Sequence, residues 1–277
     1  MRIAITGAGG QLGQALQAAF GAEHELIPLG RTDVELGHPA CVERMVATRA
    51  ELVIHPAAYT DVDGCARDPE RAYQVNGLGA QYVALACRRL GATLVYVSTN
   101  EVFDGAATAP YFEYDRAAPI NAYARSKWAG EQAVREALDR FYIVRVAWLF
   151  GGPRNFVRTV LRLAAERDNI AMVADEVGSP TYAPDAAAAI AQLVRLPFYG
   201  TYHLVNEGTC SRFEFAAEVL RLAGRERVAL RPIRLADFKR DSVVPPYTPL
   251  RNIAAAALGV RLRPWQEALA EYLQALS

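Results

Sequence analysis

The chain has 277 residues, 52% of them hydrophobic, and its 30 basic residues are balanced by 30 acidic ones. This length fits one large domain with a smaller appended lobe, and the zero net charge gives no support for a nucleic-acid-binding face. The four cysteines form no C-x-x-C pair and no run approaches 18 apolar residues, so we expect a cytoplasmic protein with reduced thiols, no metal site and no membrane span.

The N-terminal stretch predicts a dinucleotide-binding turn. Residues 2–6 form a short apolar strand, and the stretch 7–13 that follows has the spacing G-x-x-G-x-x-G and opens a helical pattern. A glycine-rich turn between a strand and a helix lets backbone N–H groups approach a pyrophosphate, whose charge then meets the helix N-terminus. We therefore expect a nicotinamide dinucleotide here.

A second strand is predicted at residues 25–29, and Arg31 lies just beyond its end. Folds of this kind that prefer NAD usually carry an acidic residue there for the ribose 2′-hydroxyl, whereas an arginine can pair with a 2′-phosphate. Arg31 therefore favours NADPH, with NADH also possible. A solvated surface arginine is the alternative interpretation.

A crossover helix at 41–49 and a third strand at 52–54 come next, and the strand opens into small residues beginning at Ala57. Small residues after a strand allow a cofactor to lie against the backbone. His55, in this tight loop, is interpreted as a structural hydrogen-bonding residue rather than a base. One long helix is predicted over residues 70–90.

The strand at residues 94–97 is followed by the side chains most suited to catalysis. Ser98, Thr99 and Glu101 follow it directly, at the end of the strand where open α/β sheets bind ligands. Asn121 is predicted to cap a helix that places Tyr123 and Lys127 four residues apart on one face. An ammonium beside a phenol favours the phenolate, so we expect a tyrosine with a lowered pKa that can exchange a proton.

The alternation of strands and helices up to residue 150 predicts a doubly wound parallel sheet, with a loop over 103–119 that covers the site and a strand at 142–146. Trp148, after that strand, is either a stacking platform or a core residue. Domains are predicted at 1–150 and 151–277, with some later segments returning to the sheet. The later elements are predicted as helices at 155–167, 184–195, 213–223, 235–240 and 264–276, a turn at 178–182 and a strand at 200–205.

Taken together, these motifs resemble the extended short-chain dehydrogenase/reductase family, and within it the dTDP-4-dehydrorhamnose reductase branch. The matching motifs are Thr6-Gly7-x-x-Gly10-x-x-Gly13, Ala57-Ala58-Tyr59-Thr60-Asp61-Val62-Asp63, Ser98-Thr99 with Val102-Phe103-Asp104-Gly105, Tyr123-x-x-x-Lys127, Arg145-x-x-Trp148 and Gly178-Ser179-Pro180-Thr181. The resemblance covers essentially the whole chain. It implies a Rossmann-type α/β fold with a smaller C-terminal substrate-binding lobe, and NAD(P)H-dependent reduction of a nucleotide-linked 4-keto-6-deoxysugar, with a homodimer possible.

The resemblance also implies roles for individual residues. Thr99 would orient the sugar C4 oxygen, Tyr123 would protonate it and Lys127 would hold the nicotinamide ribose. Glu101 completes the set of candidate catalytic residues. The implied cofactor-binding residues are Gly7, Gly10, Gln11, Leu12, Gly13, Arg31, Glu35, Leu36, Ala57, Ala58, Tyr59, Tyr123 and Lys127. The implied substrate-binding residues are Thr99, Asn100, Tyr123, Trp148 and Asn155.

Three departures from the family pattern leave other functions open. The reductases usually carry Asp-Tyr where this chain has Asn100-Glu101, Arg-Pro-x-x-Ser where it has the stretch 244–248, and asparagine in place of His55. Glu101 resembles the base of related 4,6-dehydratases, so an epimerase or dehydratase that recycles NAD is one alternative. Asn100 cannot donate a proton to a leaving hydroxyl, so the full dehydration pair is missing. A non-catalytic cofactor-binding regulatory subunit is the other alternative.

Overall fold

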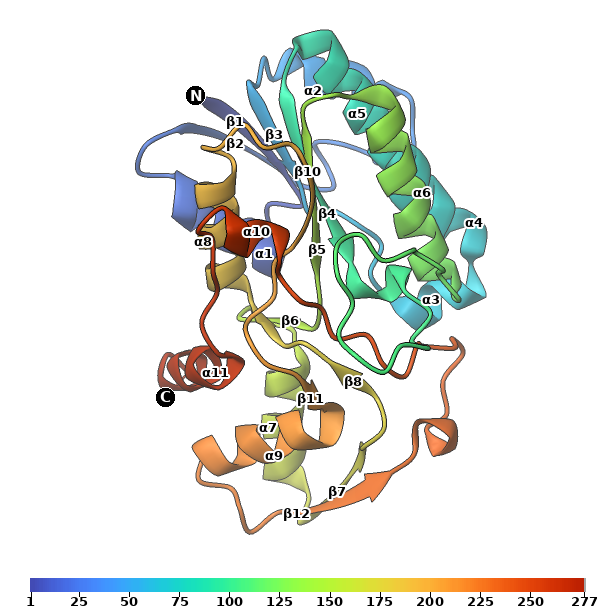
Figure 1. Ribbon diagram of the computed structural model, residues 1–277, viewed down its shortest axis with the longest axis vertical. Coiled ribbons are helices and arrows are strands. Elements are labelled where there is room, and N and C mark those ends of the chain that lie inside the picture. The colour runs from blue at the N-terminus through green and yellow to red at the C-terminus, as the bar shows by residue number, and fades with distance from the viewer. Residues whose placement is uncertain (277) are drawn as a thin grey trace.

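A parallel six-stranded sheet forms the centre of the larger lobe (Figure 1), in a computed structural model that describes residues 1–276. The strands lie in the order β10 (Gly200–His203), β5 (Phe141–Val146), β4 (Thr93–Thr99), β3 (Leu52–His55), β1 (Arg2–Thr6) and β2 (Glu25–Leu29). The chain runs from β1 outward to β2 and then crosses back to β3. The carboxyl ends of β1 and β3 therefore form a topological switch point, where open α/β sheets bind ligands.

Helices cover both faces of this sheet, so the strands are apolar on both sides, as is usual for parallel sheets. One face is covered by α1 (Gln11–Phe20) and α8 (Ala183–Leu193), and the other by α2 (Ala40–Ala47), α5 (Gly79–Leu90) and α6 (Ala122–Ala137). Ile3 and Ile5 of β1 face the first layer, whereas Ala4 between them faces the second. The predicted doubly wound α/β class is confirmed.

The helix predicted over residues 70–90 is less regular than expected. It consists of α4 (Pro69–Ala72), a π-helical segment (Tyr73–Leu78) and α5, with the short α3 (Val62–Arg67) before it. The π segment packs closely against α6, where a Cβ on Gly130 would lie 2.7 Å from the Asn76 carbonyl oxygen. The wider turn directs the buried Asn76 side chain toward the loop that follows β3, and π-bulges are often found at functional sites.

The second half of the chain contributes to both lobes. β10 and α8 lie beyond residue 150 and yet belong to the sheet and to its helical layer. The smaller lobe, below the sheet in Figure 1, is built around α7 (Phe156–Glu166), α9 (Arg212–Leu222) and α11 (Trp265–Gln274). Its short strand pairs are β12 (Ala229–Ile233) with β7 (Asn169–Val173), β11 (Cys210–Ser211) with β8 (Val177–Gly178), and β9 (Thr181–Tyr182) with β6 (Leu149–Phe150).

Two local predictions for this half were wrong. The stretch 178–182, predicted as a turn, contains the last residue of β8 and all of β9. The helix predicted at 235–240 is only a 3₁₀ turn (Leu235–Asp237). That turn buries none of its residues, and so short a helix has nothing to stabilise it without tertiary packing.

A connecting segment, residues 240–250, runs between the two lobes and is called the strap below. Near its start, the backbone N–H of Ser242 donates to Asp63, which also pairs with Arg240. Farther along, Thr248 donates its backbone N–H to Val177 of β8. The short α10 (Ala254–Ala257) follows the strap. None of the helices within residues 1–276 is long and apolar enough to cross a membrane.

Candidate active site

The end of β4 and the start of α6 bring the candidate catalytic groups together. The Asn121 side chain accepts a hydrogen bond of 2.8 Å from the Ala124 backbone N–H, which confirms the predicted helix cap. Tyr123 and Lys127 therefore lie in the first two turns of α6. Thr99, the last residue of β4, hydrogen-bonds through its side chain to the Tyr123 hydroxyl.

The ionisation of Tyr123 differs from the sequence prediction. Burial raises its pKa above the ordinary value of 10.0, the Glu101 carboxylate raises it further, and only the Thr99 hydrogen bond lowers it. The expected depression by Lys127 is absent, because the Lys127 ammonium is directed elsewhere. Tyr123 therefore keeps its proton throughout the physiological pH range, which is the state that a proton donor requires.

Lys127 is buried beneath the strand end, with only 2% of its surface exposed. Its Nζ donates a 2.7 Å hydrogen bond to the Val97 carbonyl and lies 4.2 Å from the centroid of the Tyr96 ring. Burial lowers the Lys127 pKa to about 7, against the opposing effect of the Glu131 carboxylate. The ammonium is thus close to its titration point near neutral pH.

Ser98 and His55 face away from the reaction centre. The Ser98 hydroxyl donates to Glu131 at 2.6 Å, because neighbouring strand residues point to opposite faces. His55 Nδ1 is hydrogen-bonded to the Thr6 hydroxyl at 2.7 Å, and burial lowers its pKa to about 3. The structural interpretation of His55 is confirmed by this contact.

The Asn100-Glu101 pair that departs from the family pattern is built into the site. Asn100 donates to the Thr248 hydroxyl of the strap at 2.6 Å and accepts from Thr99 at 3.2 Å. The Glu101 carboxylate accepts a hydrogen bond of 2.7 Å from the Asn121 side chain, and burial raises the Glu101 pKa. Sequence reasoning missed Thr248 as a partner, since it lies 148 residues from Asn100.

The turn after β1 has the shape that a pyrophosphate requires. Gly7 has a φ of +59°, and a Cβ on it would lie 2.9 Å from the Ala57 Cα, so the loops after β1 and β3 touch at the switch point. A Cβ on Gly13 would meet the Gly7 carbonyl oxygen at 2.3 Å, whereas Gly9 has no atom within 4 Å of that position. The first turn of α1 has no side-chain cap, so its N–H groups remain available for an anion. These residues fit a dinucleotide.

The remaining cofactor candidates line the same edge of the sheet. Arg31 and Glu35 are exposed beyond β2, and Leu36 is half-buried beside Gly79. Within residues 1–276, the Arg31 side chain makes no hydrogen bond or ion pair, so its guanidinium is available to a ligand.

The loop of Ala57, Ala58 and Tyr59 is fixed by Asn76, a residue that the sequence reasoning missed. Asn76 accepts from the Tyr59 N–H at 2.7 Å and donates to the Tyr59 carbonyl and the Ser126 hydroxyl. Asn76 lies in the π-helical segment, which could have marked it as a functional position, but the hydrophobic periodicity of the sequence does not distinguish a π-helical segment from an α-helix.

Trp148 and Asn155 stand at the start of the smaller lobe. Trp148 has a φ of +41°, its ring rests against Gly178, and the Arg212 guanidinium lies 3.6 Å from its centroid. Asn155 caps α7, and its amide group donates to the Gly152 carbonyl and to the Tyr272 hydroxyl. An added contact from Asn155 to a diphosphate therefore requires one of these two hydrogen bonds to open.

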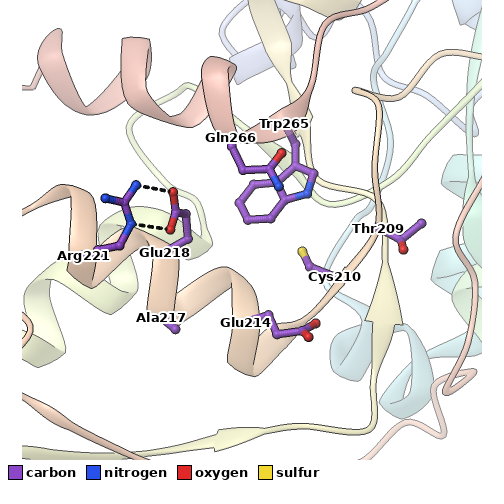
Figure 2. Close-up of a pocket in the computed structure, with 8 residues that line it drawn as sticks. All are labelled: Thr209, Cys210, Glu214, Ala217, Glu218, Arg221, Trp265 and Gln266. Carbon is purple, nitrogen blue, oxygen red and sulfur yellow. Dashed lines mark hydrogen bonds and ion pairs between the residues drawn. The ribbon is translucent and has the colours of Figure 1, made fainter.

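A surface depression on the smaller lobe is separate from this site. Figure 2 shows its lining from α9, α11 and β11, with Glu218 and Arg221 paired along α9. Cys210 in its wall is buried, and burial raises the pKa of its thiol, so it is not a reactive nucleophile. No residue of the β4 and α6 cluster lines this depression.

Comparison with known proteins agrees with this geometry. The chain matches the family described as RmlD substrate binding domain over residues 1–277. It is 41% identical to a dTDP-4-dehydrorhamnose reductase of Mycobacterium tuberculosis, over 99% of this chain and 93% of the relative. Among solved structures, it resembles a dTDP-4-dehydrorhamnose reductase of Clostridium acetobutylicum with a TM-score of 0.96 and 37% identity, covering 100% of this chain and 99% of that one. It also resembles the reductase of Bacillus anthracis in complex with NADP, with a TM-score of 0.95, 38% identity and 99% coverage of both chains.

Proposed function

The chain belongs to the RmlD substrate binding domain family, and on that basis we propose that it is a reductase that uses NADPH to convert dTDP-4-dehydrorhamnose to dTDP-rhamnose. The observation that carries this proposal is the contact between Thr99 and Tyr123, with Lys127 buried one helical turn away. A carbonyl oxygen placed at the Thr99 and Tyr123 hydroxyls would meet two hydrogen-bonding groups and one removable proton.

The chain's own residues supply orientation and the proton. When bound, NADPH supplies the hydride for C4. Thr99 holds the C4 oxygen, and Tyr123 donates its proton to that oxygen, so negative charge does not build up there. The raised pKa of Tyr123 keeps the proton in place until then.

The cofactor residues that the sequence suggested are consistent with this proposal. Gly7, Gly10 and Gly13 shape the turn, and the uncapped start of α1 offers N–H groups to the pyrophosphate. Arg31 is free to pair with a 2′-phosphate, which favours NADPH over NADH. Lys127 would hold the nicotinamide ribose once the cofactor is bound.

A direct test uses purified protein, NADPH and dTDP-4-dehydrorhamnose, with consumption of NADPH followed by its near-ultraviolet absorbance. We expect one NADPH to be consumed for each sugar reduced, and proton NMR of the product to give the configuration at C4. If the protein consumes no NADPH with this sugar but reduces other 4-keto sugars, the proposed reaction type stands and the proposed substrate is wrong.

Glu101 supports a second candidate function. Its half-buried carboxyl group lies close to Tyr123, and its raised pKa suits a base that accepts a proton from carbon. If Glu101 removes the C5 proton, the sugar nucleotide incorporates solvent deuterium at C5 without net NADPH consumption, and Glu101→Gln abolishes that exchange. The regulatory-subunit alternative has less support, since Thr99, Tyr123 and Lys127 are all present and in place.

We also propose a cytoplasmic location and a homodimeric state for the working enzyme, both carried over from the sequence-based expectation. Light scattering during gel filtration measures the mass of the particle against the 30.3 kDa of one chain. A particle of that single-chain mass at micromolar concentration contradicts the dimer.

A further inference from the structure

Lysine is almost absent from this chain, and the site retains one of the few. Of the 30 lysine and arginine residues, only Lys127 and Lys239 are lysines. Lys127 is buried, with one carbonyl and one aromatic ring as the neighbours of its Nζ. An ammonium in such a place loses its hydration, so it requires a counter-charge to remain protonated.

Glu131 lies one helical turn beyond Lys127 on α6 and has no exposed surface. Its carboxylate accepts a 2.6 Å hydrogen bond from Ser98 and two from Arg145, at 2.9 Å from Nε and 2.8 Å from Nη2. Arg135 adds a fourth at 3.2 Å. The carboxylate is thus fixed in position by β4, β5 and α6 together.

Apart from Glu131, the titratable groups around Lys127 on β3, on β4 and on its own helix α6 carry no negative charge at neutral pH. His55 on β3 is neutral, because burial lowers its pKa to about 3. Tyr96 on β4 and Tyr123 on α6 are neutral, because burial raises their pKa values. Glu131 is therefore the anionic group that opposes the burial penalty at Lys127.

Building on the reductase proposed above, we propose that Glu131 is a positioning residue that holds Lys127 in its ammonium form behind the catalytic tyrosine. The arrangement Tyr123, Lys127, Glu131 places a phenol, a cation and an anion at successive turns of one helix. Arg135 and Arg145 share the Glu131 charge, so they weaken its effect on Lys127 while they fix its geometry. Ser98 links Glu131 to β4, next to Thr99.

The scarcity of lysine makes a direct test practical. In a Lys239→Arg protein labelled with carbon-13 at lysine Cε, a single lysine signal remains, and its shift against pH reports the Lys127 pKa without cofactor or substrate. We expect Glu131→Gln to lower that pKa by about one unit, since a unit charge at helical i,i+4 spacing acts through a partly screened interior.

Variants that are expected to shift the Lys127 pKa in opposite directions distinguish an electrostatic role of Glu131 from a packing role. Arg135→Gln removes a cation from the same carboxylate, at a side chain that is one-third exposed, and should raise the Lys127 pKa. Arg125→Gln, on the exposed side of α6, should leave it unchanged. If Glu131 only maintains packing, its replacement admits water and raises the Lys127 pKa toward its ordinary value of 10.5.

A Lys127 pKa that rises or stays constant in folded Glu131→Gln overturns the proposal. If that variant does not fold, an unchanged pKa in Arg135→Gln overturns it instead. In the reductase assay, the alkaline limb of kcat/KM should move to lower pH in Glu131→Gln by the same amount as the NMR titration. Because the NMR measurement needs no sugar, a wrong substrate assignment leaves it valid.

Discussion

For single residues, the proposed reduction depends on two groups, Tyr123 and Lys127, whose pKa values are moved by burial in opposite directions. Tyr123 keeps its proton because its pKa is raised, and Lys127 approaches neutrality because its pKa is lowered to about 7. A phenol that gives up its proton only when the C4 oxygen needs it suits reduction, in which the enzyme begins as a proton donor.

The Lys127 pKa predicts how activity depends on pH. The ammonium form predominates below about pH 7, is half-populated near that value and is lost as the pH rises through it. We therefore expect kcat/KM for NADPH, which reports the free enzyme, to fall about tenfold per pH unit on the alkaline side. Steady-state rates from pH 5.5 to pH 9.5 check this, and a flat profile up to pH 9 would show that Lys127 stays charged.

In the proposed enzyme, the preference for NADPH depends on one residue, Arg31. Arg31 is exposed and has no partner within residues 1–276, so Arg31→Ala should leave folding unchanged and weaken NADPH use about tenfold or more, through loss of one charge-assisted contact. NADH use should not change. Arg44→Ala, an exposed arginine on α2, is the matched control, and an unaltered ratio of kcat/KM values in Arg31→Ala removes the basis for the NADPH preference.

Among the structural elements, the glycine-rich turn after β1 contains one glycine that is needed for folding and another whose replacement should affect only cofactor binding. A Cβ on Gly13 would lie 2.3 Å from the Gly7 carbonyl oxygen, so Gly13→Ala should lower the free energy of unfolding by about 2 kcal/mol.

A Cβ on Gly9 would have no atom within 4 Å, so Gly9 should accept alanine without a change in melting temperature. Because the added methyl group occupies the expected pyrophosphate space, Gly9→Ala should reduce the stabilisation by NADPH in thermal unfolding. Full NADPH stabilisation of Gly9→Ala would place the pyrophosphate elsewhere.

The start of α6 shows how one element serves both stability and chemistry. Asn121 caps the helix with its oxygen and uses its nitrogen to hold Glu101 and the Val243 carbonyl of the strap. A helix cap contributes about 1 kcal/mol, and here it also fixes the position of the carboxyl group beside Tyr123. The same residue therefore links secondary structure to the site.

At the scale of the whole molecule, the strap couples the smaller lobe to the reaction centre. Thr248→Val removes the hydroxyl that Asn100 binds at 2.6 Å and leaves a buried amide without its partner. We expect a rise of about tenfold in KM for the sugar, with NADPH binding unchanged. Thr209→Val, on the surface depression of the smaller lobe, is the control. Equal KM values in both variants would show that the strap does not position the site.

The parts of this molecule that sequence predicts are those encoded by local patterns. The glycine-rich turn, the strand at 94–97 and the cap at Asn121 each depend on residues within a few positions. Each is found in the structure, although the strand extends through Thr99 as β4. The Asn100 to Thr248 contact spans 148 residues, and no local pattern encodes such a contact.

The ionisation of Tyr123 was mispredicted for a related reason. The i,i+4 spacing places Lys127 near Tyr123 along the helix, but only the folded structure shows that the ammonium is bound to the Val97 carbonyl. Burial, which the sequence does not quantify, then outweighs the expected effect of the lysine.

In the proposed reaction, Tyr123 protonates the C4 oxygen of a nucleotide sugar as NADPH reduces it. The decisive measurement compares the rate of NADPH consumption with dTDP-4-dehydrorhamnose in Tyr123→Phe and in Tyr142→Phe, which removes a buried hydroxyl bonded to the Leu196 carbonyl away from the site. We predict a loss of about 1000-fold in Tyr123→Phe and little change in Tyr142→Phe, with both proteins folded and bound to NADPH. A Tyr123→Phe protein that retains the wild-type rate would show that Tyr123 is not the proton donor.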